Sequence, residues 1–298
     1  MQHKIVKPSR LLDKHGELIQ KGYALHPILK YNRADVAKKS RLKEWDYYLI
    51  YNTDYGVALT VANTTNFLMI STTFIDFHKK TEKTRSLIRI ISKKKFRMPK
   101  SSTISSIVYQ DKSISLSFRH IDQARHLKLR MKNFDGGSDF DASFVLMDEP
   151  KDSMVIATPF DEDKKAFYYN RKIIGMRASG TVIYKNKLYS FSPINSFGLL
   201  DWGRGVWPYK TTWYWGAAQG TIWGNVFGFN LGYGFGNTSA ATENMIFFNG
   251  KATKLRDVKF QIPKNDKNKY DYMKPWKITS SDSRLDLTFT PIIDRSIH

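Results

Sequence analysis

Two acidic residues and one arginine stand out because they lie within or beside a run of tryptophans. Asp201 and Arg204 occur in LDWGRGVWPY, and Glu243 occurs with Asn244 in ATEN. A carboxyl group surrounded by aromatic side chains can serve as a proton donor, because apolar surroundings favour its neutral form. If Asp201 and Glu243 converge, the chain has two carboxyl groups for acid and base catalysis, with Arg204 close by. The alternative is an ion pair between Asp201 and Arg204 that orders the loop before Pro208.

The surrounding stretch, residues 200–244, holds five of the seven tryptophans in a glycine-rich run. Within it bulky and small residues alternate, and a period of two places successive side chains on opposite faces of a strand. We therefore predict a strand with one bulky face and one face of nearly bare backbone. A bare face admits either a packed strand or loop, or a ligand, and the sequence leaves both open. The two faces are formed by Phe227, Phe229, Leu231, Tyr233 and Phe235, and by Gly228, Asn230, Gly232, Gly234 and Gly236.

Short runs of β-branched and aromatic residues, separated by turn residues, extend over most of the chain. Turns are indicated at 52–56 and 135–137, and Asn249 followed by Gly250 is the dipeptide that most favours a tight hairpin. This spacing is typical of an antiparallel meander and not of alternating strands and helices. Only residues 238–245 carry a helix signal, with Asn237 or Thr238 as the cap. We predict a mainly β, antiparallel protein with strands in similar numbers in each half.

The polar segment MDEPKD, centred on Pro150, is the strongest candidate for a linker or a long crossing between sheets. It divides the chain into an N-terminal half, residues 1–150, and a C-terminal half, residues 151–298. We predict one barrel-like unit in each half, with the tryptophan- and glycine-rich stretch in the second.

The chain is strongly basic, with 48 Lys and Arg against 27 Asp and Glu and a net charge of +21. Much of the excess lies in residues 79–100, from Lys79 to Lys100, where Glu82 is the one acid. This segment is either a solvated loop beside a strand or a patch that binds an anionic membrane surface. The absence of cysteine and of a signal-peptide pattern leads us to expect a cytoplasmic protein.

Several kinds of site are not expected. The seven histidines are scattered without metal-ligand spacing, so we assign no metal and no cofactor. The GYGFG glycines lack the helix and the lysine of a phosphate loop, and there is no nucleophile elbow. Nucleic acid is not expected as a partner, because the tryptophan-rich stretch and the basic segment are separate.

The chain resembles the bacterial domain of unknown function family 2804 over nearly its whole length. The resemblance rests on GELIQKGYA, YNR, KEWDYY, IATPF, FYYNRKI, LDWGRGVWPY, WYWG, FGFNLGYGFGN, ATEN and SSDSRLDLTFTP, followed by DR at 294–295. The family has no established activity but is similar in fold to the calycin-like double barrels of carotenoid hydratases and tocopherol cyclases. Family members usually continue beyond DR with another pair of strands, so the end at His298 indicates either a fragment or an open final sheet.

This resemblance implies two lipocalin-like, calycin-type barrels or sheets packed side by side. For the function we carry two hypotheses from different classes. The first is binding of a hydrophobic or amphipathic small molecule, such as a lipid or isoprenoid, in an aromatic-lined β pocket. The second is an enzyme of hydratase, isomerase or cyclase type that uses Asp201, Glu243 and Arg204 for proton transfer. The predicted ligand-binding residues are Trp202, Trp207, Tyr209, Trp213, Trp215, Phe229, Asn230 and Asn244.

Overall fold

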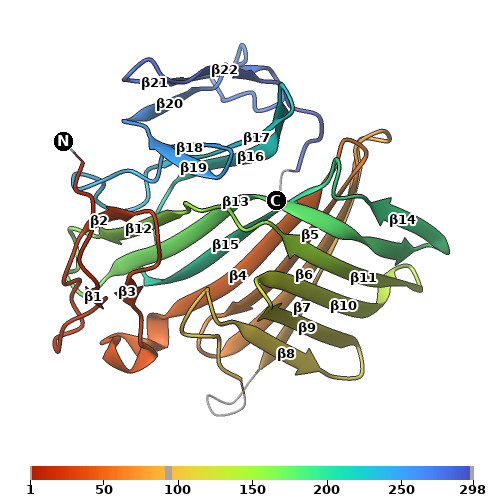
Figure 1. Cartoon of the computed structure of the whole chain (residues 1–298), viewed down its shortest axis with the longest axis horizontal. Coiled ribbons are helices and arrows are strands. Elements are labelled where there is room, and N and C mark those ends of the chain that lie inside the picture. The colour runs from red at the N-terminus through yellow and green to blue at the C-terminus, as the bar shows by residue number, and fades with distance from the viewer. Residues whose placement is uncertain (1, 91–95, 296–298) are drawn as a thin grey trace.

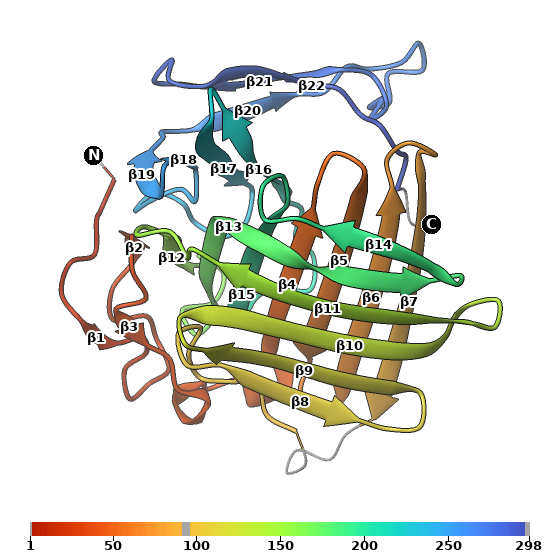
Figure 2. The ribbon, with the colours of Figure 1, turned by 45° about the vertical axis from the view of Figure 1, so that its right-hand side comes forward.

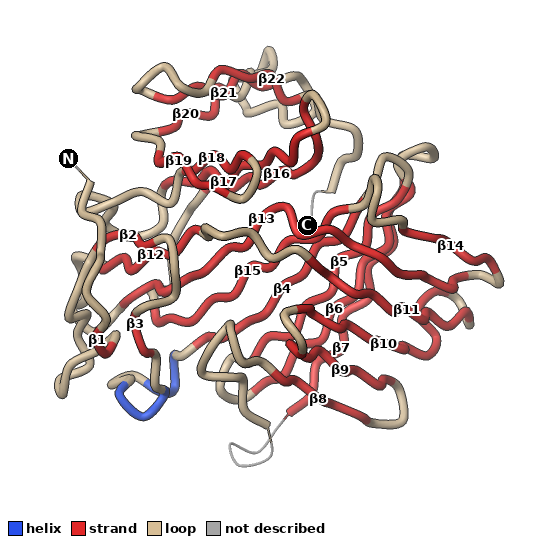
Figure 3. Tube along the Cα trace, in the orientation of Figure 1, coloured by secondary structure: helices blue, strands red, loops and turns tan. Residues whose placement is uncertain are grey.

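The computed structural model describes residues 2–90 and 96–295, and these residues form an almost entirely antiparallel β structure (Figure 3). The predicted fold class is therefore confirmed. Two 3-10 turns, η1 (Arg33–Asp35) and η2 (Lys39–Arg41), are the helical elements of this described part. None of its helices has the length and apolar character needed to cross a membrane. The helix predicted at 238–245 is wrong, because residues 238–244 are irregular and Met245 begins a strand.

A thirteen-stranded sheet dominates the fold and curls so that its two arms cross (Figures 1 and 2). The strand order is β7 (Thr81–Ile90), β6 (Phe67–Asp76), β5 (Tyr55–Asn63), β4 (Lys43–Tyr51), β15 (Phe197–Val206), β13 (Phe167–Tyr184), β11 (Ser138–Met147), β10 (Ala124–Asp135), β9 (Ile114–Ile121) and β8 (Ser106–Gln110). Three short strands are attached to it: β12 (Met154–Pro159), β2 (Gly22–Ala24) and β14 (Lys187–Phe191). The main core fills the curl with apolar side chains from both arms.

β13 joins the two arms because it bends at Gly175. This glycine has a φ of 89°, and the pairing register between β13 and β15 shifts between Ile173 and Met176. An extra residue of this kind bends a strand and increases its twist. Before the bend β13 pairs with β12 and β15, and after it β13 pairs with β11, with β14 and with the start of β15. Two charged residues of the site described below lie on the first half of β13 and on β15, which pairs with it.

The predicted boundary at residue 150 does not coincide with a break in this sheet. Two strands of the predicted C-terminal half, β13 and β15, lie between two strands of the predicted N-terminal half, β4 and β11. The strands of the two ranges are hydrogen-bonded to each other and bury the main core together.

Two smaller sheets are stacked on the outer face of the curled sheet, the first directly against it and the second on top of the first (Figure 1). One consists of β16 (Tyr214–Ile222), β17 (Asn225–Tyr233), β18 (Met245–Phe248) and β19 (Lys251–Lys254), and the other of β20 (Val258–Gln261), β21 (Trp276–Ser280) and β22 (Asp286–Phe289). A second apolar cluster joins the β16–β19 sheet to the outer face, and a third joins it to β20–β22. A short parallel pair, β1 (Ser9–Arg10) and β3 (Leu29–Lys30), is separate from these.

The alternation predicted for the glycine-rich run is confirmed in β17. Its bulky side chains, including Leu231, pack in the third cluster, while the bare face turns toward the curled sheet. A Cβ on Gly228 would lie 2.5 Å from the Ile174 side chain of β13, so only glycine permits this close packing. The predicted hairpin is also confirmed, since Asn249 and Gly250 both have positive φ between β18 and β19.

Candidate functional site

The site begins as a row of partners across the outer face of the curled sheet. Tyr47 of β4 pairs with Asp201 of β15, and Asp201 pairs with Lys172 of β13. Directly opposed residues on neighbouring strands point to the same face, so their side chains are brought together by the register alone. The Lys172 ammonium lies 3.2 Å from Oδ1 of Asp201. Both residues are buried, because the β16–β19 sheet covers this part of the outer face.

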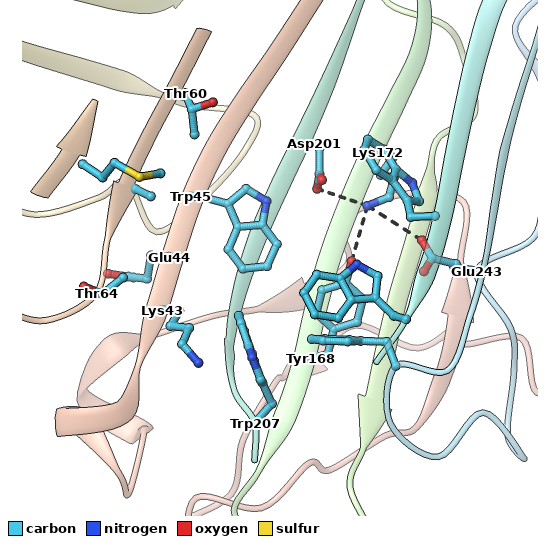
Figure 4. A pocket seen from close by; sticks show the side chains of 15 residues that line it. Lys43, Glu44, Trp45, Thr60, Thr64, Tyr168, Lys172, Asp201, Trp207 and Glu243 are labelled. Atoms are coloured by element: carbon cyan, nitrogen blue, oxygen red, sulfur yellow. Dashed lines mark hydrogen bonds and ion pairs between the residues drawn. The ribbon is translucent and has the colours of Figure 1, made fainter. Parts of the chain in front are cut away.

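Glu243 reaches the same ammonium from the other side of the cavity (Figure 4). It lies between β17 and β18, and its Oε2 is 3.7 Å from Nζ of Lys172. Lys172 also donates a hydrogen bond to the hydroxyl of Tyr168 at 3.3 Å. Its charge lies 4.7 Å from the ring centre of Trp215, a distance typical of a cation–π contact. The two acids predicted from the sequence therefore meet across one buried lysine.

The bare face of β17 provides the room and the hydrogen bonds that hold Glu243. Oε1 of Glu243 would be 2.6 Å from a Cβ at Gly232, so a side chain there would displace the carboxylate. Asn230 donates to the Glu243 backbone oxygen at 2.9 Å and to its Oε2 at 3.0 Å. The indole of Trp215 in turn donates to Oδ1 of Asn230 at 2.7 Å. These buried polar groups are paired with one another, which fixes the position of the carboxylate.

The backbone on either side of Glu243 is held as firmly. Asn244 accepts a hydrogen bond from the Gly232 amide at 2.7 Å and donates to the Arg256 carbonyl at 3.1 Å. Lys254 donates to Oγ1 of Thr242 at 2.7 Å and to the Asn244 carbonyl at 2.9 Å. Burial lowers the pKa of Lys254 to about 7. These hydrogen bonds fix the backbone of the ATEN segment and thereby the position of Glu243.

Asp201 uses one oxygen for the protein and leaves the other for the cavity. Its Oδ1 accepts from Asn170 at 2.6 Å as well as facing Lys172. Within residues 2–90 and 96–295, no hydrogen bond reaches its Oδ2. A free carboxylate oxygen beside a cavity can accept a hydrogen bond from a ligand or exchange a proton with it.

The cavity beside this cluster has a volume of about 350 Å³ and is lined mainly by aromatic rings. Trp45 packs edge-on against Trp207 with ring centres 5.7 Å apart and stacks on Tyr168 at 6.2 Å. Gly203 makes room for the Trp45 indole, because a Cβ there would lie 2.0 Å from the ring. The lining residues are Lys43, Glu44, Trp45, Thr60, Ala62, Thr64, Met69, Tyr168, Lys172, Asp201, Trp207, Trp213, Trp215, Phe235 and Glu243.

Two tyrosines at the cluster stay protonated at physiological pH. Burial, and after it the charges of Glu243 and Asp201, raises the pKa of Tyr168 well above its ordinary value. Burial raises the pKa of Tyr47 to about 12. Tyr168 is therefore a neutral hydroxyl that can donate its proton in a hydrogen bond to a ligand while it accepts one from Lys172.

A family model for a domain of unknown function, DUF2804, matches residues 2–298. The chain belongs to the DUF2804 family. The resemblance found in its motifs is thereby confirmed.

Solved structures similar to this DUF2804 chain include an AttH-like protein from Nitrosomonas europaea, with a TM-score of 0.56 and 11% identity over 85% of this chain and 81% of that chain. Kievitone hydratase from Nectria haematococca has a TM-score of 0.44 and 10% identity, over 92% of this chain and 83% of that chain. No curated protein sequence matches the chain. At these identities the likeness to the AttH-like protein shows the fold alone.

The DUF2804 string LDWGRGVWPY divides between the two faces of β15. Trp207 lines the cavity with Asp201, but Trp202 and Arg204 point to the opposite face, into the main core. Arg204 does not pair with Asp201. It lies 3.0 Å from Asp46 and 3.7 Å from Glu44, and it donates to the Pro99 carbonyl at 2.9 Å. Positions 201 and 204 are an odd number apart, so a strand must separate them.

The other predicted ligand residues of this DUF2804 chain take different positions. Trp213 and Trp215 line the cavity, while Asn230 and Asn244 support Glu243 from behind. Phe229 packs in the third apolar cluster, away from the cavity. Tyr209 is exposed, with the Arg41 guanidinium 4.8 Å from its ring centre.

Sequence reasoning missed the residue at the centre of the site, Lys172, together with Tyr168, Trp45 and Phe235. Lys172 and Tyr168 lie in FYYNRKI, and four residues apart on a strand they share a face. A lysine within an otherwise buried strand needs a charged partner, and this was the signal that could have found it. Among residues 2–90 and 96–295, no three His, Cys, Asp or Glu side chains gather as a possible metal site.

Proposed function

We propose that this chain binds an apolar or amphipathic small molecule that carries one hydrogen-bonding polar group. The observation that supports this is the cavity of about 350 Å³, with aromatic walls and a few polar groups gathered at one place. Ligand pockets of proteins have volumes of roughly 300–1,000 Å³ and this same division between apolar walls and convergent polar groups.

The polar group of the ligand is expected to meet Asp201 and Tyr168. Oδ2 of Asp201 is an acceptor, so a ligand hydroxyl or amine can donate to it. The Tyr168 hydroxyl can in turn donate to a ligand oxygen. With both acids ionised, the group of Asp201, Glu243 and Lys172 carries one excess negative charge, which disfavours a carboxylate or phosphate at this position.

Mass spectrometry of the protein purified from its own cells without detergent tests this proposal. We expect an apolar compound in close to equal ratio to the protein, and its loss in Ala62→Phe, which fills the cavity. Ile183→Phe places the same side chain at an exposed strand position and serves as the control, so it should retain the compound. An empty wild-type protein, or equal retention in Ala62→Phe, would contradict binding in this cavity.

Proton transfer to a bound alkene is the second candidate, because two acids share one ammonium inside an aromatic cavity. In a hydration, the carboxyl group of Asp201 would give its proton to one alkene carbon and leave a cation on the other. The aromatic faces would stabilise that cation, water oxygen would bond to it, and the released water proton would return to a carboxylate. The net reaction adds water to the alkene to give an alcohol, and the protonation of the protein is the same before and after.

Isotope exchange distinguishes this candidate from simple binding. The compound extracted from the protein is incubated with fresh protein in H₂¹⁸O and D₂O. An enzyme of hydratase type incorporates both isotopes, and an isomerase or cyclase incorporates deuterium alone. Asp201→Asn should abolish incorporation while binding persists. No incorporation by the wild type would exclude the enzyme and leave the binding proposal standing.

A further inference from the structure

The aromatic cavity continues into an exposed apolar surface at the edge of the curled sheet. One row of cross-strand partners runs from Trp45 through Ala62 and Met69 to Ile88 on β7. The first three line the cavity, and Ile88 is exposed. Because paired residues share a face, the row forms one apolar track from the cavity wall to the sheet edge.

More large apolar side chains surround the opening of the cavity. Thr64 and Trp213 both line the cavity and are exposed, so the cavity opens between the β5–β6 turn and the loop before β16. Phe67 and Ile90 are direct partners on the same face as Ile88. We call this set the mouth surface, and its exposed fractions are 46% for Phe67, 62% for Ile88, 87% for Ile90, 90% for Tyr209 and 51% for Trp213. Such a cluster of exposed side chains marks a binding surface.

Several cations border the mouth surface. The Lys43 ammonium lies 4.0 Å from the ring centre of Trp207, and Arg41 donates to the Trp207 carbonyl. Asp163, whose charge attracts Arg41, forms an ion pair with Lys38. Lys39 and Lys210 are exposed beside them, with the Lys39 carbonyl accepting from Thr65 of the β5–β6 turn at 2.8 Å. The border therefore attracts anions.

The basic segment 79–100 contributes differently from what its composition indicates. Lys83 of β7 lies 2.9 Å from Asp135, and Arg89 lies 2.7 Å from Asp111, so these charges are neutralised locally. Residues 91–95, which include Lys93, lie outside the described part. What β7 brings to the mouth surface is the apolar pair Ile88 and Ile90.

We propose that the mouth surface docks on an anionic lipid bilayer, so that the ligand passes between the bilayer and the cavity. The proposal rests on the proposed binding function, because an apolar ligand is scarce in water and concentrated in membranes. Exposed aromatic and aliphatic side chains enter the headgroup boundary, and the bordering cations bind anionic headgroups. A nucleic acid or an acidic protein would use the cations but not the aliphatic side chains Ile88 and Ile90.

Co-sedimentation with lipid vesicles tests the docking. Phosphatidylcholine vesicles with and without phosphatidylglycerol are compared, for the wild type and for two double variants, Phe67→Ser with Ile88→Ser and Lys39→Glu with Lys210→Glu. Matched controls are Ile183→Ser with Leu188→Ser and Lys112→Glu with Lys128→Glu, which change exposed strand or turn residues elsewhere.

We expect the wild type to bind the anionic vesicles. The affinity for them should fall more than about tenfold in each mouth variant and less than about threefold in the controls. For the lysine variant this follows because each basic residue near such a surface contributes about 1 kcal/mol. Equal binding to neutral vesicles, or equal losses in mouth and control variants, would overturn the proposal. Unchanged vesicle binding by the variant with Phe67→Ser and Ile88→Ser would also overturn it, because the protein would then bind by charge alone. Ala62→Phe should still bind vesicles, so an empty cavity and a failed docking are separate results.

Discussion

Removing the central cation is the most informative perturbation of the site. Lys172→Met keeps the length of the side chain and removes its charge, which leaves Asp201 and Glu243 without an ammonium. The Lys172 side chain is 2% exposed, and each acid is 11% exposed. Taking one partner from a buried ion pair typically costs about 3–5 kcal/mol, because the remaining charge is neither solvated nor paired. We expect a loss of this size in the free energy of unfolding at pH 7, measured by urea denaturation.

A surface control and a second substitution identify the cause of this loss. Lys83→Met removes an ammonium 2.9 Å from Asp135, a closer contact, but the lysine is 45% exposed, and surface pairs contribute at most about 1 kcal/mol. Adding Asp201→Asn to Lys172→Met should reduce the loss, because it removes one of the two uncompensated charges. A loss below about 1 kcal/mol, or one that Asp201→Asn leaves unchanged, would refute the account of a buried charged cluster.

Three further predictions concern the surroundings of the site. Gly203→Ala forces a Cβ into the Trp45 indole, so it should lower the free energy of unfolding by about 1–3 kcal/mol through overpacking and should weaken ligand binding. Gly220→Ala is the control, because the space around Gly220 is open, and it should change neither stability nor ligand affinity. Equal effects of the two substitutions would contradict the packing described. Arg204→Lys should lower the free energy of unfolding by at least about 2 kcal/mol, because it breaks buried hydrogen bonds, and should leave ligand affinity unchanged. A changed affinity in the folded variant would place Arg204 in the site. The free energy of unfolding should fall as the pH rises from about 10 to 12, by up to about 1.4 kcal/mol per pH unit for each buried tyrosine, because the unfolded chain releases its phenolic protons first. Flat stability over this range would contradict the pKa values near 12 that burial gives to Tyr31, Tyr47, Tyr48 and Tyr51.

Local patterns predicted the strands well and the faces of the strands in part. The alternation in β17 is visible in the sequence because one of its faces carries almost no side chains. β15 is buried on both faces, so its residues show no polar alternation, and LDWGRGVWPY reads as one cluster. A strict period of two would still have separated Asp201 from Arg204.

The meeting of Asp201 and Glu243 could be raised as a hypothesis from the sequence, but local patterns could not establish it. It depends on the register of β15 against β13 and on the β16–β19 sheet covering the outer face. Neither is a local property of the chain. Arg171 and Lys172 show the same limit, because these adjacent cations point to opposite faces and find different partners, Glu149 and Asp201.

The cavity lies between two sheets, on the outer face of the curl, whereas the sequence predicts that the tryptophan- and glycine-rich stretch belongs to a barrel-like unit of its own. The interior of the curl is instead filled by its own core and by buried ion pairs such as Arg204 with Asp46. The glycines of β17 explain the difference, because they let the small sheet approach the outer face closely enough to enclose a cavity.

Quenching of tryptophan fluorescence by a brominated fatty alcohol tests the central claim most directly. Bromine quenches indoles at short range, and Trp45, Trp207, Trp213 and Trp215 all line the cavity. We predict saturable quenching at one alcohol per chain in the wild type and in Ile183→Phe, and its loss in Ala62→Phe. Quenching that does not saturate, or that is the same in Ala62→Phe, would contradict a ligand site between the two sheets.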